Sequence, residues 1–258
     1  MNTSPGRGDA VIEVIGLEDV PLIKKGDDLG QILFNSIARM GIKLDPTDIL
    51  VVTQKIVSKA EGRIIDLDTV RPSKLAETIA HQTGHDPRHL EVILGESKRI
   101  VKMKGRHLIT ELRTGHICAN AGVDRSNVDE KGSVTLLPLD PDESAVKMRR
   151  RLKELSGVEV AIIISDTSGR PFRMGQVNLA VGSAGIAPLR SYLNRQDIFG
   201  RELTVTAIAI ADELASAAEL VMNKTDKIPA VLIRGYRFRT SIKGAKALVR
   251  PAEQDLFA

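Results

Sequence analysis

The sequence predicts a mixed fold of helices and strands, of the α/β or α+β class, and three observations support this prediction. Short runs rich in β-branched residues, such as residues 49–52 and 158–165, are typical of buried strands. Apolar residues recur at helical spacing in residues 29–40, and helix-like and strand-like segments are interspersed without an internal repeat. Aromatic residues make up only 3% of the 258 residues, so the core must consist of Ile, Leu, Val and Ala.

The individual elements follow from periodicity and from turn residues. Strands are expected at residues 11–15, 49–52, 108–112, 117–119, 134–137, 158–165, 203–210 and 229–233. Helices are expected at residues 29–40, 73–83, 89–100, 140–157 and 213–222. Asp27 or Asp28 can cap the first of these helices. Residues 53–63 and 166–170 are expected to be polar loops that follow buried strands.

The composition of the chain narrows the classes of partner that it can bind. The formal net charge is +4 and the pI is about 9.2, which suits nucleic acid, a membrane surface or small anionic substrates. With two Tyr and five Phe, the chain has few side chains on which single-stranded bases could stack. No apolar run approaches the roughly 20 residues that cross a bilayer, and the N-terminus lacks the pattern of a signal peptide. We therefore expect a cytoplasmic protein that binds phosphorylated small molecules and neither nucleic acid nor membrane.

The common metal and nucleotide motifs are missing. His81, His85 and His89 recur every four residues, which could align metal ligands on a helix, but Gly84 and Pro87 interrupt that helix. Solvated surface histidines are therefore the favoured interpretation. No HExxH or paired-cysteine motif suggests zinc. Neither a GxxxxGK[ST] loop nor a GxGxxG after a strand occurs, so a nucleotide site must be built from other elements.

Carboxylates at strand ends are the better signal. Asp166 follows the hydrophobic run 161–164 and Ser165, and Thr167 comes next. A carboxylate and a hydroxyl at the mouth of a buried strand suit a hard cation such as Mg²⁺ or Mn²⁺. The alternative is an Asx-type turn formed by Asp166 and Thr167, and spacing alone does not separate the two interpretations.

Asp124 is a similar case. It ends the segment 120–124, which follows an expected strand and contains Gly122, a residue that permits a tight backbone path. Asp124 could be a second carboxylate on the same metal, and Asn127 could reach a base, sugar or phosphate. The alternative is that Asp124 caps a helix.

Two further residues have two interpretations each. Lys59 could offset the charge of a phosphate, although a solvated loop lysine is the commoner case. Cys118 is the one cysteine of the chain, so no intrachain disulfide can form. It is more consistent with a small buried residue than with a nucleophile.

Six segments, in this order, resemble the coenzyme F420-0:L-glutamate ligase (F420 γ-glutamyl ligase) family. They are VPLIKKGDDL (20–29), IVSKAEGRI (56–64), NAGVDRSNV (120–128), LPLDPDESA (137–145), IISDTSGRPFRMG (163–175) and DIFGRELTVTAIAIADELASAAELVMNKTDKIPAVLIRG (197–235). The resemblance implies an unusual two-part α+β fold that forms an intertwined homodimer. Residues 11–239 would form one ligase unit of two intertwined subdomains, between a disordered lead (1–10) and a C-terminal tail (240–258).

The resemblance also implies a reaction. The γ-phosphate of GTP would pass to the terminal carboxylate of coenzyme F420-0, giving an acyl phosphate. The amine of L-glutamate would then displace phosphate, giving F420-1, and many family members add a second glutamate to reach F420-2. Two divalent ions, Mg²⁺ or Mn²⁺, would assist, and K⁺ is a further candidate.

Carried over by position, Asp124 and Asp166 would be catalytic and would bind the divalent metal. Thr167 and the backbone carbonyl of Met222 would bind a second ion. The residues expected to contact GTP are Val20, Pro21, Leu22, Ile23, Gln54, Lys55, Lys59, Asn127, Leu220, Val221, Met222, Asn223, Lys224, Thr225, Asp226 and Lys227.

This chain departs from the family pattern at two places. Gln54 and Lys55 stand where some members have small hydroxyl residues, and Asn223 stands where Gly is common. Separately, Arg170 and Arg173 could hold the phosphodiester or carboxylate of the substrate in a bidentate way, or form a structural salt bridge. Rival interpretations are a ligase or phosphohydrolase acting on another carboxylate, and a nucleotide sensor or basic RNA-binding module.

Overall fold

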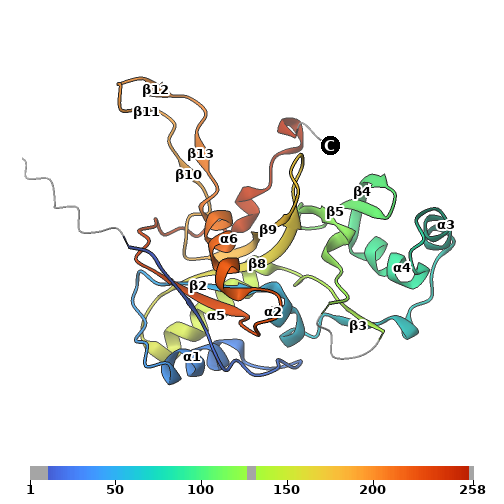
Figure 1. The fold of residues 1–258 in the computed structure, drawn as a ribbon, viewed down its shortest axis with the longest axis horizontal. Helices are drawn as coiled ribbons and strands as arrows, with labels where there is room; N and C mark the ends of the chain where they lie inside the picture. Colours follow the sequence, from blue (N-terminus) through green and yellow to red (C-terminus); the bar gives the residue numbers. More distant parts are fainter. Residues whose placement is uncertain (1–10, 127–131, 256–258) are drawn as a thin grey trace, which may run out of the picture.

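A computed structural model describes residues 11–126 and 132–255 of the chain. Its centre is a five-stranded sheet with the strand order β1-β14-β2-β8-β9 (Figure 1). The strands are β1 (Glu13–Gly16), β14 (Ala230–Arg234), β2 (Ile49–Thr53), β8 (Ala161–Gly169) and β9 (Gln176–Ala184). β2 and β8 run parallel, with Thr53 opposite Ser165, and the other neighbouring pairs are antiparallel. The expected mixture of helices and strands is therefore confirmed.

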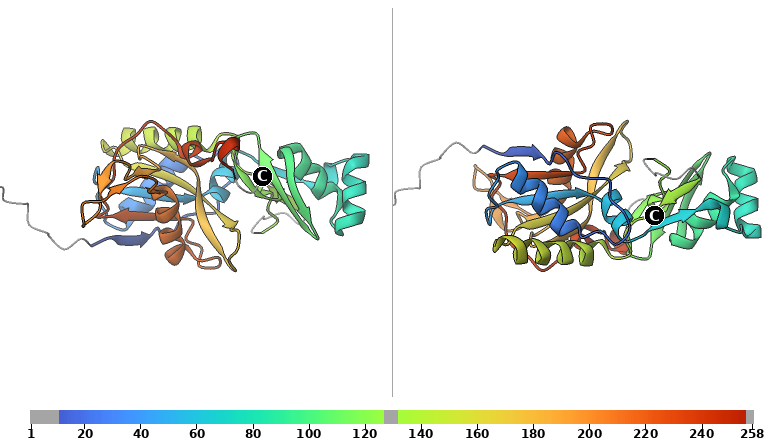
Figure 2. Two further views of the ribbon diagram at one scale, coloured as in Figure 1. Left: turned by 90° about the horizontal axis from the view of Figure 1, so that it is seen from above. Right: turned by 90° about the horizontal axis from the view of Figure 1, so that it is seen from below.

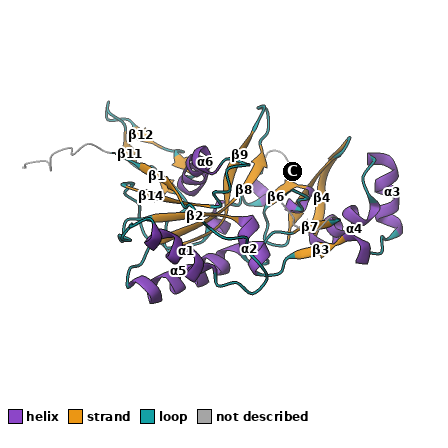
Figure 3. Cartoon of the chain, turned by 60° about the horizontal axis from the view of Figure 1, so that its bottom comes forward, coloured by secondary structure: helices purple, strands orange, loops and turns teal. Residues whose placement is uncertain are grey.

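Helices cover both faces of this sheet because its strands are apolar on both sides. Helices α1 (Leu29–Arg39) and α5 (Pro141–Ser156) cover one face, where Leu50 and Ile162 belong to the core. Helix α6 (Ile210–Met222) covers the other face, against Val51 and Ile163 (Figure 3). All four strand residues are fully buried, and each such side chain contributes about 1.5–3 kcal/mol of hydrophobic stabilisation.

Acidic caps fix the starts of the two long helices on the first face. Asp28 caps α1 by accepting the N–H of Gln31 at 3.0 Å, which selects Asp28 from the two candidates in the sequence. Asp140 caps α5 by accepting the N–H of Glu143 at 2.9 Å. Arg151 of α5 forms an ion pair with Asp28 at 2.7 Å and so joins the two helices.

The segment between α2 (Gln54–Ala60) and α5 forms a second part, which we call the insertion. It projects to one side of the central sheet (Figure 2) and has its own apolar cluster. Its elements are β3 (Ile64–Asp66), η1 (Leu67–Thr69), α3 (Lys74–Thr83), α4 (Pro87–Glu96), β4 (Ser97–Lys104), β5 (His107–Leu112), β6 (Ile117–Ala119), η2 (Asn120–Gly122) and β7 (Ser133–Thr135). Gly84 ends α3 with φ +70°, as the sequence suggests, and α4 begins at Pro87, two residues before the predicted start at residue 89.

A long hairpin, which we call the arm, extends away from the central sheet (Figure 1). It consists of β10 (Arg190–Ser191), β11 (Arg195–Gln196), β12 (Glu202–Leu203) and β13 (Ala207–Ile208). Three large apolar side chains on the arm, Ile198, Phe199 and Val205, are more than 80% exposed. Beyond β14 the chain returns through η3 (Ala245–Leu248) and η4 (Ala252–Gln254), and Ala245 packs into the core on the α6 side.

Four sequence predictions were wrong in detail. Residues 54–60 form helix α2 instead of a polar loop. Residues 166–169 continue strand β8, because β9 pairs with them, and an Asx turn is thereby excluded. The helix predicted to end at residue 100 ends at Glu96, where strand β4 begins. Within the segment 203–210, which was predicted as one strand, only Leu203 of β12 and the two residues of β13 are in strands, and α6 already begins at Ile210.

Within the described part of the chain, no helix has both the length and the apolar character needed to cross a membrane.

Candidate active site

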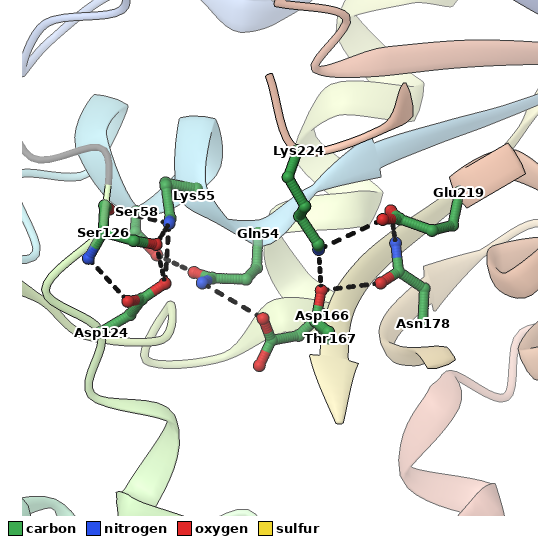
Figure 4. Close-up of polar contacts among 10 residues, drawn as sticks. All are labelled: Gln54, Lys55, Ser58, Asp124, Ser126, Asp166, Thr167, Asn178, Glu219 and Lys224. Atoms are coloured by element: carbon green, nitrogen blue, oxygen red, sulfur yellow. Dashed lines mark hydrogen bonds and ion pairs between the residues drawn. The ribbon is translucent and has the colours of Figure 1, made fainter. Parts of the chain in front are cut away.

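The site lies at the carboxyl ends of the parallel strands β2 and β8. Because Thr53 pairs with Ser165, the residues that follow each strand meet at the same edge of the sheet. On one strand these are Gln54 and Lys55, the first residues of α2. On the other is Asp166, within the part of β8 that extends past the end of β2 (Figure 4).

Asp124 reaches this edge from the insertion. Its backbone N–H and C=O form hydrogen bonds with Thr135 at 2.9 and 2.8 Å, which fix the position of the loop. The approach is a left-handed turn, with Ala121 at φ +53° and Gly122 at φ +67°. A Cβ atom on Gly122 would lie 2.6 Å from the side chain of Leu137, so the conformation favours glycine and the close packing against Leu137 leaves little space for a side chain. The residues that a helix capped by Asp124 would occupy lie partly outside the described residues, at 127–131.

Lys55 forms an ion pair with Asp124. Its Nζ lies 2.7 Å from Asp124 Oδ2, and it also donates to the carbonyl and the hydroxyl of Ser126 at 2.8 and 2.7 Å. Burial would raise the pKa of Asp124, but the hydrogen bonds from Lys55 and from the Ser126 N–H outweigh burial. The net effect lowers the pKa of Asp124, so this carboxyl group is ionised at neutral pH.

Asp166 is in the opposite electrostatic situation. Burial and, to a smaller extent, the negative charge of Asp124 raise the pKa of Asp166 to about 6, although the Thr167 N–H acts against them. Its side-chain donor is the amide of Gln54, at 3.5 Å, a weak contact. Ser58 orients that amide by donating to Gln54 Oε1 at 2.9 Å. Asp166 is thus a partly buried carboxylate beside a second carboxylate, without a cation of its own.

Thr167 points to the other face of β8, where it belongs to a second cluster of polar side chains with Asn178, Glu219 and Lys224. Thr167 Oγ1 donates to Asn178 Oδ1 at 2.8 Å, and the Asn178 amide donates to Glu219 at 2.8 Å. Lys224 donates to Thr167 and forms an ion pair with Glu219 at 3.3 Å. Sequence reasoning missed Asn178 and Glu219, because strand β9 was not predicted and because a glutamate within an amphipathic helix carries no signal of its own.

The end of α6 offers a further oxygen to this second cluster. Met222 is the last residue of α6, and its side chain is buried. Backbone carbonyls in the last helical turn lack intrahelical partners and lie at the negative end of the helix dipole, which suits a cation. The following residue, Asn223, has φ +47° and ψ 179°, which lies outside the left-handed helical region and close to a region that glycine alone adopts readily. The backbone is therefore strained at the place where Gly is common.

The oxygen atoms of Asp124 and Asp166 fit a hard divalent cation. Asp166 in particular is under-satisfied, because a partly buried carboxylate meets a single weak side-chain donor. Across the described ranges, however, no group of three or more His, Cys, Asp or Glu side chains is arranged to hold a metal ion. An ion at this place would have to take its other ligands from substrate phosphates and water, as Mg²⁺ commonly does.

Some of the residues expected to contact GTP lie beside Asp124, Asp166 or Thr167, and others lie elsewhere. Gln54 and Lys55 lie at the two aspartates, and Lys224 lies at Thr167. Lys59 is buried within α2, so it is not a solvated loop lysine. Residues 20–23 lie in the loop between β1 and α1, where Ile23 is buried and Leu22 is exposed.

The rest of the expected set lies at and after the end of α6, or outside the described residues. Asn127 lies outside the described residues. The expected GTP contacts at and after the end of α6 are Leu220, Val221, Met222, Asn223, Lys224, Thr225, Asp226 and Lys227.

Other candidate residues from the sequence have clear outcomes. Cys118 is buried, as expected, and burial raises the pKa of its thiol to about 12. His89 is also buried, contrary to the expectation of a surface residue, and burial lowers its pKa to about 4. Arg170 and Arg173 lie at the turn between β8 and β9, and within the described chain neither forms an ion pair, so the structural salt bridge is absent.

A cavity of about 300 Å³ lies away from these contacts, along the outer edge of β9. Its carboxylates have structural roles that explain them. Asp212 accepts the N–H of Ala180 at 2.9 Å, and Asp142 accepts the N–H groups of Ser183 and Ala245 at 2.8 and 2.7 Å. These side chains satisfy backbone groups that an edge strand would otherwise leave unpaired.

Comparison with known proteins places the chain in a family. A model of the family described as F420-0:Gamma-glutamyl ligase matches residues 18–235. The "Coenzyme F420:L-glutamate ligase" of Methanothermobacter thermautotrophicus is 48% identical over 249 residues, which cover 95% of this chain and 98% of the relative. The proteins of the same name from Methanopyrus kandleri and Methanocaldococcus jannaschii are each 46% identical, over 95% of this chain and 98% and 96% of the relatives. The chain therefore belongs to the F420-0:γ-glutamyl ligase family.

Proposed function

We propose that this protein is a GTP-dependent ligase that joins L-glutamate to coenzyme F420-0, giving F420-1 and, after a second addition, F420-2. The observation that carries the proposal is the meeting of Asp124 and Asp166 at one edge of the sheet, beside Lys55, in a member of this family. Paired carboxylates and a lysine can support phosphoryl transfer without a Walker loop when metal ions neutralise the phosphates, because the reaction depends mainly on positioning and charge stabilisation.

The reaction has two steps. An oxygen of the coenzyme's terminal carboxylate attacks the γ-phosphorus of GTP, the bond to the β-phosphate oxygen breaks, and GDP leaves. The amine of glutamate then attacks the acyl carbon, loses a proton and expels inorganic phosphate, which leaves an amide. Each step builds negative charge on phosphate oxygens, so positioning and charge neutralisation are the main tasks of the protein.

The residues divide these tasks. Asp124 and Asp166 would hold one divalent ion, Mg²⁺ or Mn²⁺, and Thr167 with the Met222 carbonyl would hold a second ion, with K⁺ as a further monovalent candidate. The ions would supply Lewis-acid stabilisation of the transferring phosphoryl group. Lys55 and Lys59 would neutralise phosphate oxygens that the ions leave exposed.

The remaining GTP contacts would come from residues 20–23 on one side and residues 220–227 on the other. Asn127 would add a contact from the insertion. Arg170 and Arg173, which have no ion-pair partner among the described residues, are suited to hold the acidic groups of the coenzyme. The net charge of +4 is consistent with two anionic substrates.

We further propose that the protein is a homodimer. The arm carries Ile198, Phe199 and Val205 in exposed positions, where isolated apolar side chains on a projecting hairpin have little to pack against in one subunit. A second copy of the chain would bury them.

The direct test is product analysis. Purified protein is incubated with GTP, Mn²⁺, L-glutamate and coenzyme F420-0, and the products are weighed by mass spectrometry. A glutamyl mass increment with one GDP released per increment is the expected result, and the number of increments gives the number of glutamates added. Release of GDP without the increment would indicate another acceptor, and the absence of nucleotide turnover would favour a binding module.

A further inference from the structure

Lys55 occupies the position on Asp124 that a divalent ion would need. Both oxygens of Asp124 are engaged: Oδ1 accepts the Ser126 N–H at 2.7 Å, and Oδ2 accepts Lys55 at 2.7 Å and the Ser126 hydroxyl at 2.8 Å. A cation that binds Asp124 through Oδ2 therefore displaces the ammonium group. Asp166 places no such demand, because its contact from Gln54 is long and uncharged.

The lysine is held firmly but can leave. It makes three contacts, with Asp124 and with the carbonyl and hydroxyl of Ser126, and each is between 2.7 and 2.8 Å. Its side chain keeps 19% of its surface exposed, and that of Asp124 keeps 40%, so neither is enclosed. The lysine stem is flexible and carries a compact charge, so it can move from one anion to another close by.

We propose that Lys55 competes with the divalent ion for Asp124 and gives way when nucleotide phosphates offer it another anionic partner. The divalent ion and the nucleotide then bind cooperatively, since each binding event removes part of the cost of the other. By linkage, the factor by which nucleotide tightens metal binding equals the factor by which metal tightens nucleotide binding. The nucleotide half of this proposal rests on the proposed function, whereas the competition for Asp124 rests on the contacts alone.

The consequence for catalysis is that Lys55 disfavours binding of the divalent ion when no nucleotide is present. A site with two ionised carboxylates and no competing cation would bind divalent ions in the absence of nucleotide. With Lys55 on Asp124, the metal-free site is already partly neutralised, and the ion arrives together with the phosphates on which it acts. Lys55 is in this sense a positioning residue as well as a phosphate contact.

The test is Mn²⁺ binding, measured by the electron paramagnetic resonance signal of free Mn²⁺, with and without GDP. Lys55→Met keeps the length of the side chain and removes its charge. It should tighten Mn²⁺ binding in the absence of GDP by about tenfold, the scale of one charge-assisted hydrogen bond. The factor by which GDP tightens Mn²⁺ binding should fall accordingly.

Two further variants keep the test falsifiable. Lys98→Met is the matched control, because Lys98 forms an ion pair with Glu111 at 2.6 Å in the insertion and should leave Mn²⁺ affinity unchanged. Ser126→Ala removes one anchor of the Lys55 ammonium group and should tighten Mn²⁺ binding less than Lys55→Met does. Thermal unfolding shows whether each variant is folded. If Lys55→Met does not fold, the comparison of Ser126→Ala with the wild type takes its place.

Unchanged or weaker Mn²⁺ binding by Lys55→Met, or by Ser126→Ala where Lys55→Met does not fold, would overturn the proposal. So would a GDP effect on Mn²⁺ that stays at the wild-type factor. The assay contains neither glutamate nor coenzyme, so its outcome is independent of the reaction. Competition at Asp124 without any glutamyl product would leave this inference standing and contradict the proposed function.

Discussion

The insertion and the central sheet each supply one aspartate to the site, and the two aspartates differ. Asp124 of the insertion is ion-paired with Lys55, and its pKa is lowered. Asp166 of the sheet has no cationic partner of its own, and burial raises its pKa to about 6. This difference shows that Lys55 compensates the charge of the carboxylate from the insertion, whereas no lysine or arginine of the described residues forms an ion pair with the carboxylate of the sheet. A bound cation therefore stabilises the Asp166 side more.

Replacing the sheet aspartate should have the largest effect. Asp166→Asn removes the uncompensated charge, and turnover should fall by more than the 10–100-fold that is typical of losing an outer-shell partner of a metal ligand. The fold should persist, as checked by circular dichroism. The rate is measured at saturating GTP and Mn²⁺. Turnover at the wild-type rate would show that Asp166 does not bind the metal.

Acid sensitivity should be a property of the insertion. His89 in α4 is buried, its Nε2 has no hydrogen-bond partner among the described residues, and burial lowers its pKa from 6.5 to about 4. Since the unfolded chain binds the proton more readily, His89 lowers stability progressively as pH falls from about 6.5 to about 4. Between pH 7 and pH 4.5, His89→Leu should reduce this pH-dependent loss by about 2 kcal/mol.

Denaturant unfolding at pH 7 and pH 4.5 measures the effect. His81, which is exposed in α3, provides the matched control, and His81→Leu should leave the pH dependence as in the wild type. If His89→Leu lost stability on acidification as steeply as the wild type, the histidine would be charged in the folded state.

The two aspartates should also differ in what they do for stability when metal is removed. With EDTA at pH 7, Asp124→Asn should lower the free energy of unfolding by about 0.5–1 kcal/mol, because it breaks an ion pair that solvent partly screens. Asp166→Asn should not lower it, since Asn relieves a charge that burial disfavours. Equal destabilisation by both substitutions would contradict the electrostatic contrast between the insertion and the sheet.

Sequence reasoning singled out both aspartates as candidates but not their surroundings. The hydrophobic run of β8 and the tight turn at Gly122 drew attention to Asp166 and Asp124, because strand ends and glycine turns leave local signals, and the family resemblance then favoured a functional role for both. The contact between Lys55 and Asp124 joins residues 69 positions apart, which no local pattern encodes.

The end of β8, the start of α2 and the burial of His89 also depend on contacts that the local sequence does not encode. Residues 166–169 have turn-forming character, and only pairing with β9 makes them a strand. Helix α2 begins directly after β2 without a side-chain cap, so its start carried no signal. The burial of His89 results from packing within the insertion, whereas the interruption of the histidine pattern by Gly84 and Pro87 had favoured a surface residue.

The smallest effect is expected at Cys118, which lies in β6 of the insertion, close enough to Asp166 for that charge to raise its pKa further. With a pKa of about 12, the thiol of the native protein should resist alkylation by iodoacetamide at pH 8 and should react after unfolding. Cys118→Ala should retain wild-type turnover. Rapid alkylation with loss of activity would reveal a reactive thiol at the site.

The most direct test of the central claim uses ¹⁸O in both oxygens of the terminal carboxylate of coenzyme F420-0. If the site forms an acyl phosphate, one ¹⁸O passes to inorganic phosphate for each amide formed, and the other stays in the amide carbonyl. Mass spectrometry of the released phosphate and of the glutamylated coenzyme measures both. We expect singly labelled phosphate in equal amount to the amide. Unlabelled phosphate together with amide formation would contradict phosphoryl transfer to the carboxylate.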